Sequence, residues 1–290
     1  MPEERPALES VVSALLPLAL LAGAALAVRG TWRRFRARLT ENSLILNETL
    51  PVHSKWWRDH AKVRGELLYV ALGDSAAQGI GASRPDHSYV GVLARLIRDT
   101  TARSVRVVNL SVSGATVDLA VQDQLPKLAK YRPDVMTVAI GANDIAKWDP
   151  VQFERGLRRI FAAVPSHALV ADLPFFYFPR NERKVAVANE ILRRLAAEHG
   201  LTVVRLHHET RMRGFRRMFT HFANDMFHPN DHGYRVWADA FRPALIASLA
   251  ERFPVEADGA EDASAGPAMA SEADVAAPAG SVPGDVAGRP

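Results

Sequence analysis

The sequence contains no cysteine among its 290 residues. This absence excludes a disulfide framework, a thiolate metal site and a cysteine nucleophile, so any covalent catalysis must use another side chain. It does not fix the compartment, because many exported proteins also lack disulfides. Hydrophobic residues make up 48% of the chain, which is enough to build a packed core at this length.

Aromatic residues are missing from the end of the chain, which is rich in alanine, glycine, proline, serine and acidic residues. Such a segment cannot bury enough apolar surface to offset the entropy lost on ordering, so we expect residues 254–290 to form a disordered acidic tail. Seven acidic residues and one arginine lie in this tail, so the rest of the chain is more basic than the net charge of +4 indicates. A basic body favours anionic surroundings, or simply reflects an arginine-rich composition.

Charged residues are absent from residues 10–28, an apolar run long enough to cross a bilayer as a helix. Glu3, Glu4 and Arg5 precede this run, whereas five arginines follow it between positions 29 and 38. By the positive-inside rule, we predict a stub over residues 1–9 and a single-pass membrane anchor over residues 10–28, with the following domain in the cytoplasm. Small residues at 24–27 also suit signal cleavage and export, and a buried core helix is a third interpretation.

Residues 29–65 are interpreted as a basic connector that has some helical content. Trp56 and Trp57 lie near its end, beside Arg58 and Lys62. Tryptophan with flanking basic residues is typical of a membrane interface, but both tryptophans would also suit packing against the domain that follows.

From residue 66 the hydrophobic pattern alternates between strand-like and helix-like segments. Apolar runs typical of buried strands occupy residues 67–72, 105–110, 135–140, 168–173 and 201–206. Helical spacing is found at 89–100, 117–130, 150–164, 181–199 and 230–252. This alternation predicts an α/β domain over residues 66–253, with a five-stranded parallel sheet covered by helices on both faces.

Four short polar blocks follow predicted strands or precede the last helix. Ser75 ends the block 73–75 after the first strand, and Gly114 ends the block 109–114 after the second. Asn143 lies in the block 141–144 after the third strand, and Asp225 and His228 precede the final helix. Since ligand sites form beyond the carboxyl ends of parallel strands, we expect these blocks to meet at one edge of the sheet.

In this order and on this α/β pattern, the four blocks resemble those of the SGNH hydrolases, the GDSL-type esterase and lipase family. The resemblance covers residues 66–249 and implies a flavodoxin-like three-layer α/β/α sandwich and hydrolysis of ester or thioester bonds through an acyl-serine intermediate. It implies Ser75 as the nucleophile and Asp225 and His228 as the base pair. The implied oxyanion donors are the backbone N–H groups of Ser75 and Gly114 and the side chain of Asn143. Ser111 departs from the glycine common in relatives, which narrows the expected site slightly.

These residue types fit the implied roles on chemical grounds. Histidine has a pKa near neutral, so His228 is suited to take the serine proton and return it to the leaving group. Asp225, three positions earlier, is close enough to orient the imidazole. Asn143 offers an uncharged N–H donor to a developing oxyanion, and Gly114 allows close backbone approach. Asp74 is interpreted as a helix or turn cap.

The sequence therefore predicts a membrane-anchored serine hydrolase that cleaves carboxylic ester or thioester bonds of lipid or acyl substrates, with no metal and no cofactor. Carbohydrate deacetylation or acyl transfer at the same site, and a non-catalytic membrane-tethered binding module, are the alternatives. Nucleic acid is not an expected partner, because no recognition motif accompanies the positive charge. The oligomeric state, the acyl chain length and the leaving group stay open. Residues 175–178, all aromatic, line an acyl pocket in one interpretation and form ordinary core in another.

Overall fold

Five parallel strands form the central sheet in the order β2-β1-β3-β4-β5. The computed structural model describes residues 5–212 and 220–254, except for the side chains of residues 5–23 and 47. The strands are β1 (Leu67–Gly73), β2 (Val105–Asn109), β3 (Val135–Ala139), β4 (Leu169–Ala171) and β5 (Thr202–Val204). This is the flavodoxin-type strand order, so the predicted parallel α/β sheet is confirmed.

Helices lie between successive strands and after β5. They are α3 (Ser75–Gln78), α4 (Tyr89–Thr101), α5 (Val117–Asp123), α6 (Leu125–Leu128), α7 (Pro150–Ala163), α8 (Pro179–Glu198), α9 (Leu206–Met212) and α10 (Asp231–Arg252), with short 3-10 turns at Pro85–His87 and Asn143–Ile145. The single helix expected at 117–130 is divided into α5 and α6. Pro126 lies in the first turn of α6, where backbone N–H groups have no partner within the helix, so the N–H that proline lacks costs no hydrogen bond. Inside one continuous helix, the same proline would remove a backbone hydrogen bond and break the helix.

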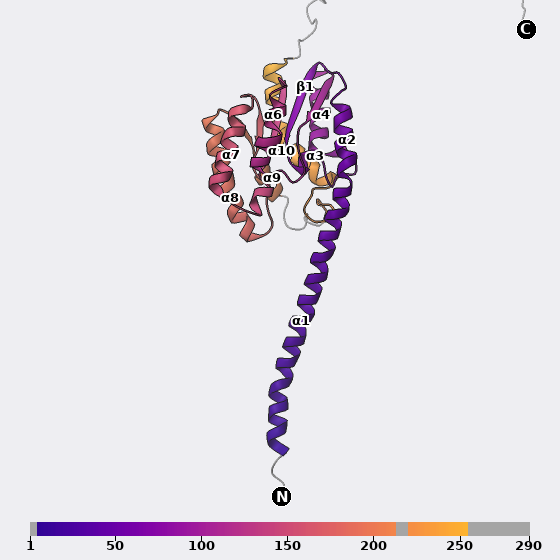
Figure 1. The fold of residues 1–290 in the computed structure, drawn as a ribbon, viewed down its shortest axis with the longest axis vertical. Helices are drawn as coiled ribbons and strands as arrows, with labels where there is room; N and C mark the ends of the chain where they lie inside the picture. Colours follow the sequence, from indigo (N-terminus) through magenta and orange to yellow (C-terminus); the bar gives the residue numbers. More distant parts are fainter. Residues whose placement is uncertain (1–4, 213–219, 255–290) are drawn as a thin grey trace, which may run out of the picture. The chain divides into compact units, whose positions relative to one another are not determined.

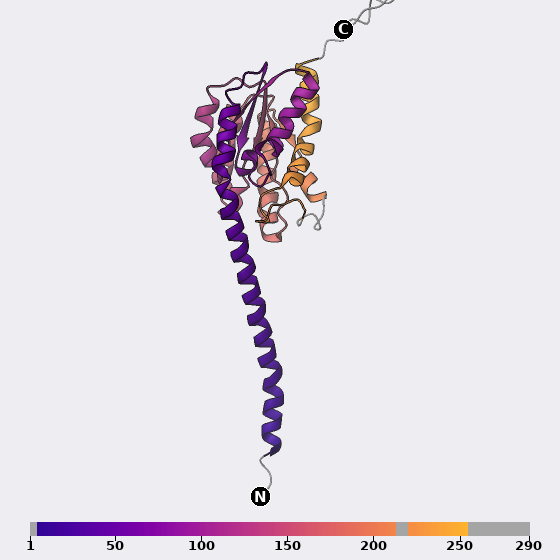
Figure 2. The ribbon, with the colours of Figure 1, turned by 90° about the vertical axis from the view of Figure 1, so that its right-hand side faces the viewer.

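Alternate residues of β1 supply two separate cores, because successive side chains of a strand point to opposite faces. Val70 and Leu72 pack with α5, α7 and α8 on one face. Tyr69 and Ala71 pack with α3, α4 and α10 on the other. Figures 1 and 2 show these helices on either side of the sheet, which makes the domain a three-layer sandwich.

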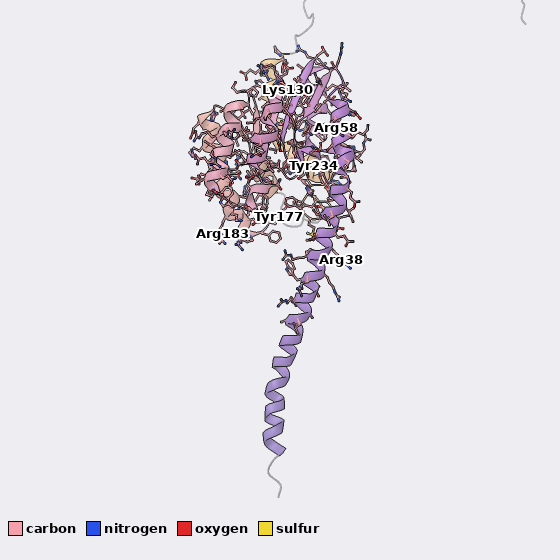
Figure 3. All side chains as sticks on the ribbon, in the orientation of Figure 1. Arg38, Arg58, Lys130, Tyr177, Arg183 and Tyr234 are labelled. Atoms are coloured by element: carbon pink, nitrogen blue, oxygen red, sulfur yellow. The ribbon has the colours of Figure 1, made fainter. Side chains whose placement is uncertain are left out.

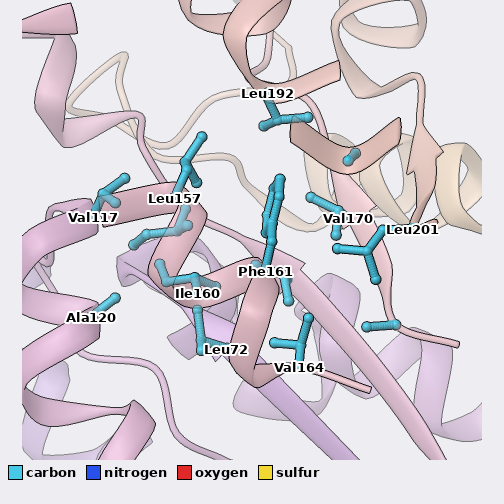
Figure 4. Packing of buried hydrophobic residues seen from close by; sticks show 14 of the residues in the cluster. Leu72, Val117, Ala120, Leu157, Ile160, Phe161, Val164, Val170, Leu192 and Leu201 are labelled. Carbon is cyan, nitrogen blue, oxygen red and sulfur yellow. The ribbon is translucent and has the colours of Figure 1, made fainter. Parts of the chain in front are cut away.

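The core beneath α7 is fully closed. Leu157, Ile160 and Phe161 of α7 are at most 2% exposed and lie against Leu72 and Val170 of the sheet (Figure 4). Burial of each such side chain contributes about 1.5–3 kcal/mol relative to an exposed position. The result is a rigid sheet whose carboxyl edge holds the loops that carry the predicted site.

Two helices precede the sheet, α1 (Arg5–Glu48) and α2 (Leu50–His60). Among the described residues, none of the helices combines the length and the apolarity needed to cross a bilayer. The side chains of residues 5–23 lie outside the described residues. Residues 10–23 are most of the anchor expected at 10–28, so the anchor stays a prediction. The predicted tail, from residue 255 onward, and residues 213–219 also lie outside the described residues.

Helix α2 packs beside β2 and belongs to the same core as α4 and α10. Trp57 is 3% exposed in this core, and its indole Nε1 donates a hydrogen bond to the Gln78 carbonyl at 2.9 Å. Trp56 is only partly buried and stacks on the His60 ring. Of the two interpretations of the tryptophans, domain packing therefore applies to Trp57.

Replacing Trp57 by alanine is expected to lower the free energy of unfolding by about 3–5 kcal/mol, because the change empties a large core site and removes a buried hydrogen bond. Urea denaturation followed by circular dichroism measures the loss. Trp56→Ala is the matched control and should lose much less. Equal losses in the two variants would contradict the assignment of α2 to the core.

Candidate active site

Ser75 is the first residue of α3, directly after the carboxyl end of β1. Asp74 caps this helix by accepting a hydrogen bond from the Ala76 N–H at 2.9 Å. A glycine is required at position 73, since a Cβ there would come within 2.6 Å of the Ala139 carbonyl oxygen and 2.8 Å of the Ala77 Cβ. The sharp strand-to-helix turn is thus possible only with glycine, which has no side chain, at its start. This turn places the Ser75 hydroxyl at the edge of the sheet.

The loop before α10 carries His228 and Asp225. Asp225 accepts backbone hydrogen bonds from the N–H groups of Phe227 and His228, both at 3.0 Å, through its Oδ1 atom. This tight turn holds Met226 at a φ of +53°, a conformation that few non-glycine residues adopt. The loop is closed by the hydrogen bond from the Ala223 N–H to the His228 carbonyl at 2.8 Å. The backbone therefore fixes the direction of the imidazole ring.

Ser75, His228 and Asp225 form one continuous hydrogen-bonded chain. The His228 Nε2 atom lies 3.0 Å from Ser75 Oγ, and the His228 Nδ1 atom lies 2.6 Å from Asp225 Oδ2. With Nδ1 facing a carboxylate, the network assigns the proton to Nδ1 and leaves Nε2 free to accept the serine proton. All three residues are buried, which strengthens these contacts relative to water.

The electrostatics of the carboxylate suit this arrangement. Burial alone would raise the pKa of Asp225, but the hydrogen bond from His228, the electrostatic attraction to that ring and two backbone N–H groups outweigh it and hold the pKa below its usual range. Because its pKa is lower in the folded state, Asp225 stabilises that state at pH values above its unfolded pKa. This stabilisation is lost as the pH falls through the folded pKa. Asp225 is therefore ionised at neutral pH, as an imidazole partner must be.

The pKa of Asp74 is shifted in the opposite direction. Burial raises its pKa to about 6, although the Ala76 N–H and the nearby His228 act against the shift. The folded chain then binds this proton more tightly than the unfolded chain does, so the contribution of Asp74 to stability falls as the pH rises from about 4 to about 6. The capping interpretation of Asp74 agrees with its hydrogen bond to Ala76.

Asn143 and Gly114 are placed differently. Asn143 lies with Ser75 and His228 in the wall of one cavity, where its Nδ2 atom donates to the Ala115 carbonyl at 3.0 Å and faces Asp74 Oδ2 at 3.5 Å. Gly114 has a φ of +76°, which favours glycine, but it is exposed and is not among the described residues that line this cavity. The structure therefore brings Asn143 to Ser75, while the role of the Gly114 N–H stays a prediction.

Gln78, which the sequence analysis did not single out, links three parts of the site. Its side-chain Nε2 donates to the Ser111 carbonyl at 2.5 Å, and its Oε1 accepts from the Ser54 hydroxyl at 3.2 Å. Its backbone carbonyl accepts from Trp57 and faces His53 Nδ1 at 3.1 Å. Helix α2 is thus bonded to the helix of Ser75, which in turn is bonded to the loop that leads to Gly114. The sequence carries no signal for this role of Gln78, because the role depends on where α2 packs in the folded domain.

Ser111 does not narrow the site as expected. Its hydroxyl donates to the Asn109 side chain, and it is not among the described residues that line the cavity. Asn109 in turn donates from Nδ2 to the Ala77 carbonyl at 2.7 Å, which ties this loop to α3. Both residues therefore support the backbone of the second polar block.

The cavity beside Ser75 has a volume of about 200 Å³. One wall is the segment after β4, where Phe175, Phe176 and Tyr177 lie in the cavity lining; Tyr177 is labelled in Figure 3. The opposite wall comes from the loop of His228, and the rings of Tyr177 and Phe222 meet at 5.8 Å between centroids. Of the two interpretations of the aromatic segment, lining a pocket is the one that the structure supports.

Helices α8 and α9 hold the backbone of the aromatic wall. The Phe175 N–H donates to Thr210 Oγ1 at 2.9 Å, and the Phe176 N–H donates to Glu182 Oε1 at 2.5 Å. His207 lies 3.0 Å from the other oxygen of Glu182, so it braces the wall. Within the described part of the chain, no three histidine, aspartate or glutamate residues cluster as metal ligands do.

The fold and the site together define an α/β sandwich hydrolase with a serine, a histidine and an aspartate at the carboxyl edge of its sheet. The chain belongs to the GDSL-like lipase/acylhydrolase family, whose pattern it matches over residues 71–236, more than half of its length. At the family level it is therefore an esterase- or lipase-like hydrolase of carboxylic esters.

Solved structures with the same fold cover 63% of this chain. TesA superposes with a TM-score of 0.53 at 22% identity over 99% of its own length. LAE5, described as an α/β hydrolase enzyme from the metagenome of Lake Arreo in Spain, superposes with a TM-score of 0.51 at 24% identity over 96% of its own length. A variant of an acetyl xylan esterase from Geobacillus stearothermophilus gives 0.50 at 20% identity over 96%. Among curated proteins, no significant match to the sequence was found.

Replacing Gln78 by leucine is expected to lower kcat for ester hydrolysis about tenfold with little change in KM, because the Ser111 loop loses its bond to α3 while the cavity walls stay in place. The free energy of unfolding should fall by about 1–3 kcal/mol, since the buried Ser111 carbonyl is left without a donor. Steady-state kinetics and urea denaturation provide the two measurements. The exposed Gln152→Leu is the matched control, and kinetics of Gln78→Leu equal to those of this control would refute the link.

Proposed function

We propose that the chain hydrolyses carboxylic esters or thioesters of acyl substrates through an acyl-serine intermediate on Ser75. The observation that carries the proposal is the 3.0 Å contact between Ser75 Oγ and His228 Nε2, continued at 2.6 Å from His228 Nδ1 to Asp225 Oδ2. A serine hydroxyl is a weak nucleophile by itself and needs an adjacent base that a third group orients. These three residues supply that combination.

In the acylation step, Ser75 Oγ attacks the carbonyl carbon and its proton passes to His228 Nε2. Asp225 stabilises the imidazolium that forms, and the oxygen of the tetrahedral intermediate accepts N–H hydrogen bonds from Asn143 and from the backbone of Ser75 and Gly114. Asn143 donates through the N–H that makes the longer of its two contacts, the one at 3.5 Å to Asp74 Oδ2. His228 then protonates the leaving alkoxide or thiolate as the carbon–oxygen or carbon–sulfur bond breaks. Water repeats the sequence on the acyl-serine and releases the carboxylic acid.

The Ser75→Ala variant should lose turnover of p-nitrophenyl esters by about 10⁴-fold or more and should no longer react with a fluorophosphonate probe, because the attacking oxygen is gone. A colorimetric assay and gel-based labelling test this. The exposed Ser166→Ala serves as the control and should retain full activity and labelling. Retained turnover in a folded Ser75→Ala variant would rule out the mechanism.

In the same assay, Asn143→Ala should lower kcat by about 10²–10³-fold, because the oxyanion loses one N–H donor.

We also propose that residues 10–28 tether the enzyme to a membrane, with the catalytic domain on the cytoplasmic side. Support comes from the uncharged run and from the five arginines that follow it between positions 29 and 38. The full chain should sediment with membranes and resist alkaline extraction, whereas a variant that lacks residues 10–28 but keeps α2 should not. A full chain found only in the soluble fraction, or one cleaved near residue 27, would contradict the tether.

A further inference from the structure

We propose that the 200 Å³ cavity beside Ser75 binds the acyl part of the substrate and selects uncharged aliphatic acyl groups of about six to eight carbons. This inference rests on the proposed role of Ser75 as nucleophile. It goes further by assigning the cavity to one side of the ester bond and to one class of acyl group.

The cavity is continuous with the reacting groups. Its lining includes Ser75, Asn143 and His228, so a group that occupies it is joined directly to the carbonyl carbon under attack. Asn143 lies at the start of the turn after β3, and the aromatic segment follows β4, the neighbouring strand. The apolar walls therefore begin next to the proposed oxyanion donor.

The walls are suited to a hydrocarbon. The side chains that form them come from the segment after β4, the loop of His228 and helix α10, and include Phe175, Phe176, Tyr177, Phe222, Phe227 and Trp237. The hydroxyl of Thr210, which also lines the cavity, is already bonded to the Phe175 N–H and the Leu206 carbonyl. Asn181 and His221 also line the cavity, but the aromatic faces offer a sugar few hydrogen-bond partners, whereas an alkyl chain gains free energy by leaving water.

The acyl group is the better occupant for a mechanistic reason. The alcohol must leave before water attacks the acyl-serine, and the water needs a polar path to His228 Nε2. An aromatic-walled cavity repels water, so it suits the group that stays bound through both steps. The leaving alcohol then departs through the side that is open to solvent.

The volume limits the chain length. An apolar protein cavity of about 150 Å³ holds one benzene molecule, which has six carbons, so about 200 Å³ corresponds to about eight carbons. An acetyl group would leave most of this space unfilled, and a palmitoyl chain would extend beyond it. Each methylene that enters the cavity should raise kcat/KM about fourfold until the space is filled.

The experiment measures kcat/KM of the full chain for monomeric p-nitrophenyl esters from acetyl to palmitoyl. We expect a rise of about 10²-fold from acetyl to hexanoyl and no further rise beyond octanoyl. Ethyl octanoate and octyl acetate, which have the same composition, decide which side of the ester occupies the cavity, and ethyl octanoate should be cleaved at least tenfold faster. Equal or faster cleavage of acetyl esters, or of octyl acetate, would overturn the proposal, as would a rise that continues to palmitoyl.

Cavity variants test the location. Phe222→Ala removes a wall side chain and should move the preferred chain length upward by two or more carbons. Phe35→Ala, on α1 and outside the cavity lining, is the matched control and should leave the profile unchanged. An unchanged profile in a folded Phe222→Ala variant would place the selecting site elsewhere.

A binding measurement separates this proposal from the proposed function. Calorimetry with the Ser75→Ala variant compares octanamide with acetamide, neither of which needs catalysis to bind. Octanamide should bind at least tenfold more tightly, with the negative heat-capacity change of apolar burial. If no ester is cleaved but octanamide binds, the cavity assignment stands and the mechanism fails. If esters are cleaved but octanamide binds no better than acetamide, the cavity assignment fails.

Discussion

The contact between Ser75 Oγ and His228 Nε2 requires two distant parts of the chain to be held at a fixed separation. The two residues are 153 positions apart in the chain, yet their side chains must meet within 3.0 Å. A parallel sheet makes this possible, because the carboxyl ends of all its strands lie at the same edge. The loop of His228 is held there by α10, whose Tyr234 hydroxyl donates a hydrogen bond to the Ile80 carbonyl at 2.7 Å. The rigid cores on both faces keep that edge from shifting by the ångström that would separate a hydroxyl from its base.

Hydrogen bonds from neighbouring segments hold the short helix α3 in position. Helix α3 is a single turn, too short to be stable alone, and so it depends on bonds made by its neighbours. Asp74 caps its start, Asn109 binds the Ala77 carbonyl, and Gln78 joins its end to α2 and to Ser111. The nucleophile is therefore positioned from three directions, and part of that support comes from residues that precede the region matched by the family.

The sequence alone was sufficient for the sheet, because continuous apolar runs bounded by glycine and polar residues are hard to satisfy in any other way. The resemblance carried by the four polar blocks indicated Ser75, Asp225 and His228, and the structure brings these three side chains into contact, while their catalytic roles stay a prediction. The division between α5 and α6 at Pro126 was missed, although proline chemistry provides the reason. The burial of Trp57 and the direction of the Asn143 amide could not be predicted, since both depend on tertiary partners distant in sequence. The same holds for the exposed position of Gly114.

The bonds from Trp57, His53 and Ser54 to Gln78 bear on where the domain can be cut. A recombinant fragment that began after α2, at residue 62, would expose apolar residues at the edge of the sheet and leave the Gln78 carbonyl without Trp57 and His53 and its side chain without Ser54. The smallest unit that folds around Ser75 therefore begins before Leu50, about twenty residues ahead of the boundary that family similarity marks at residue 71.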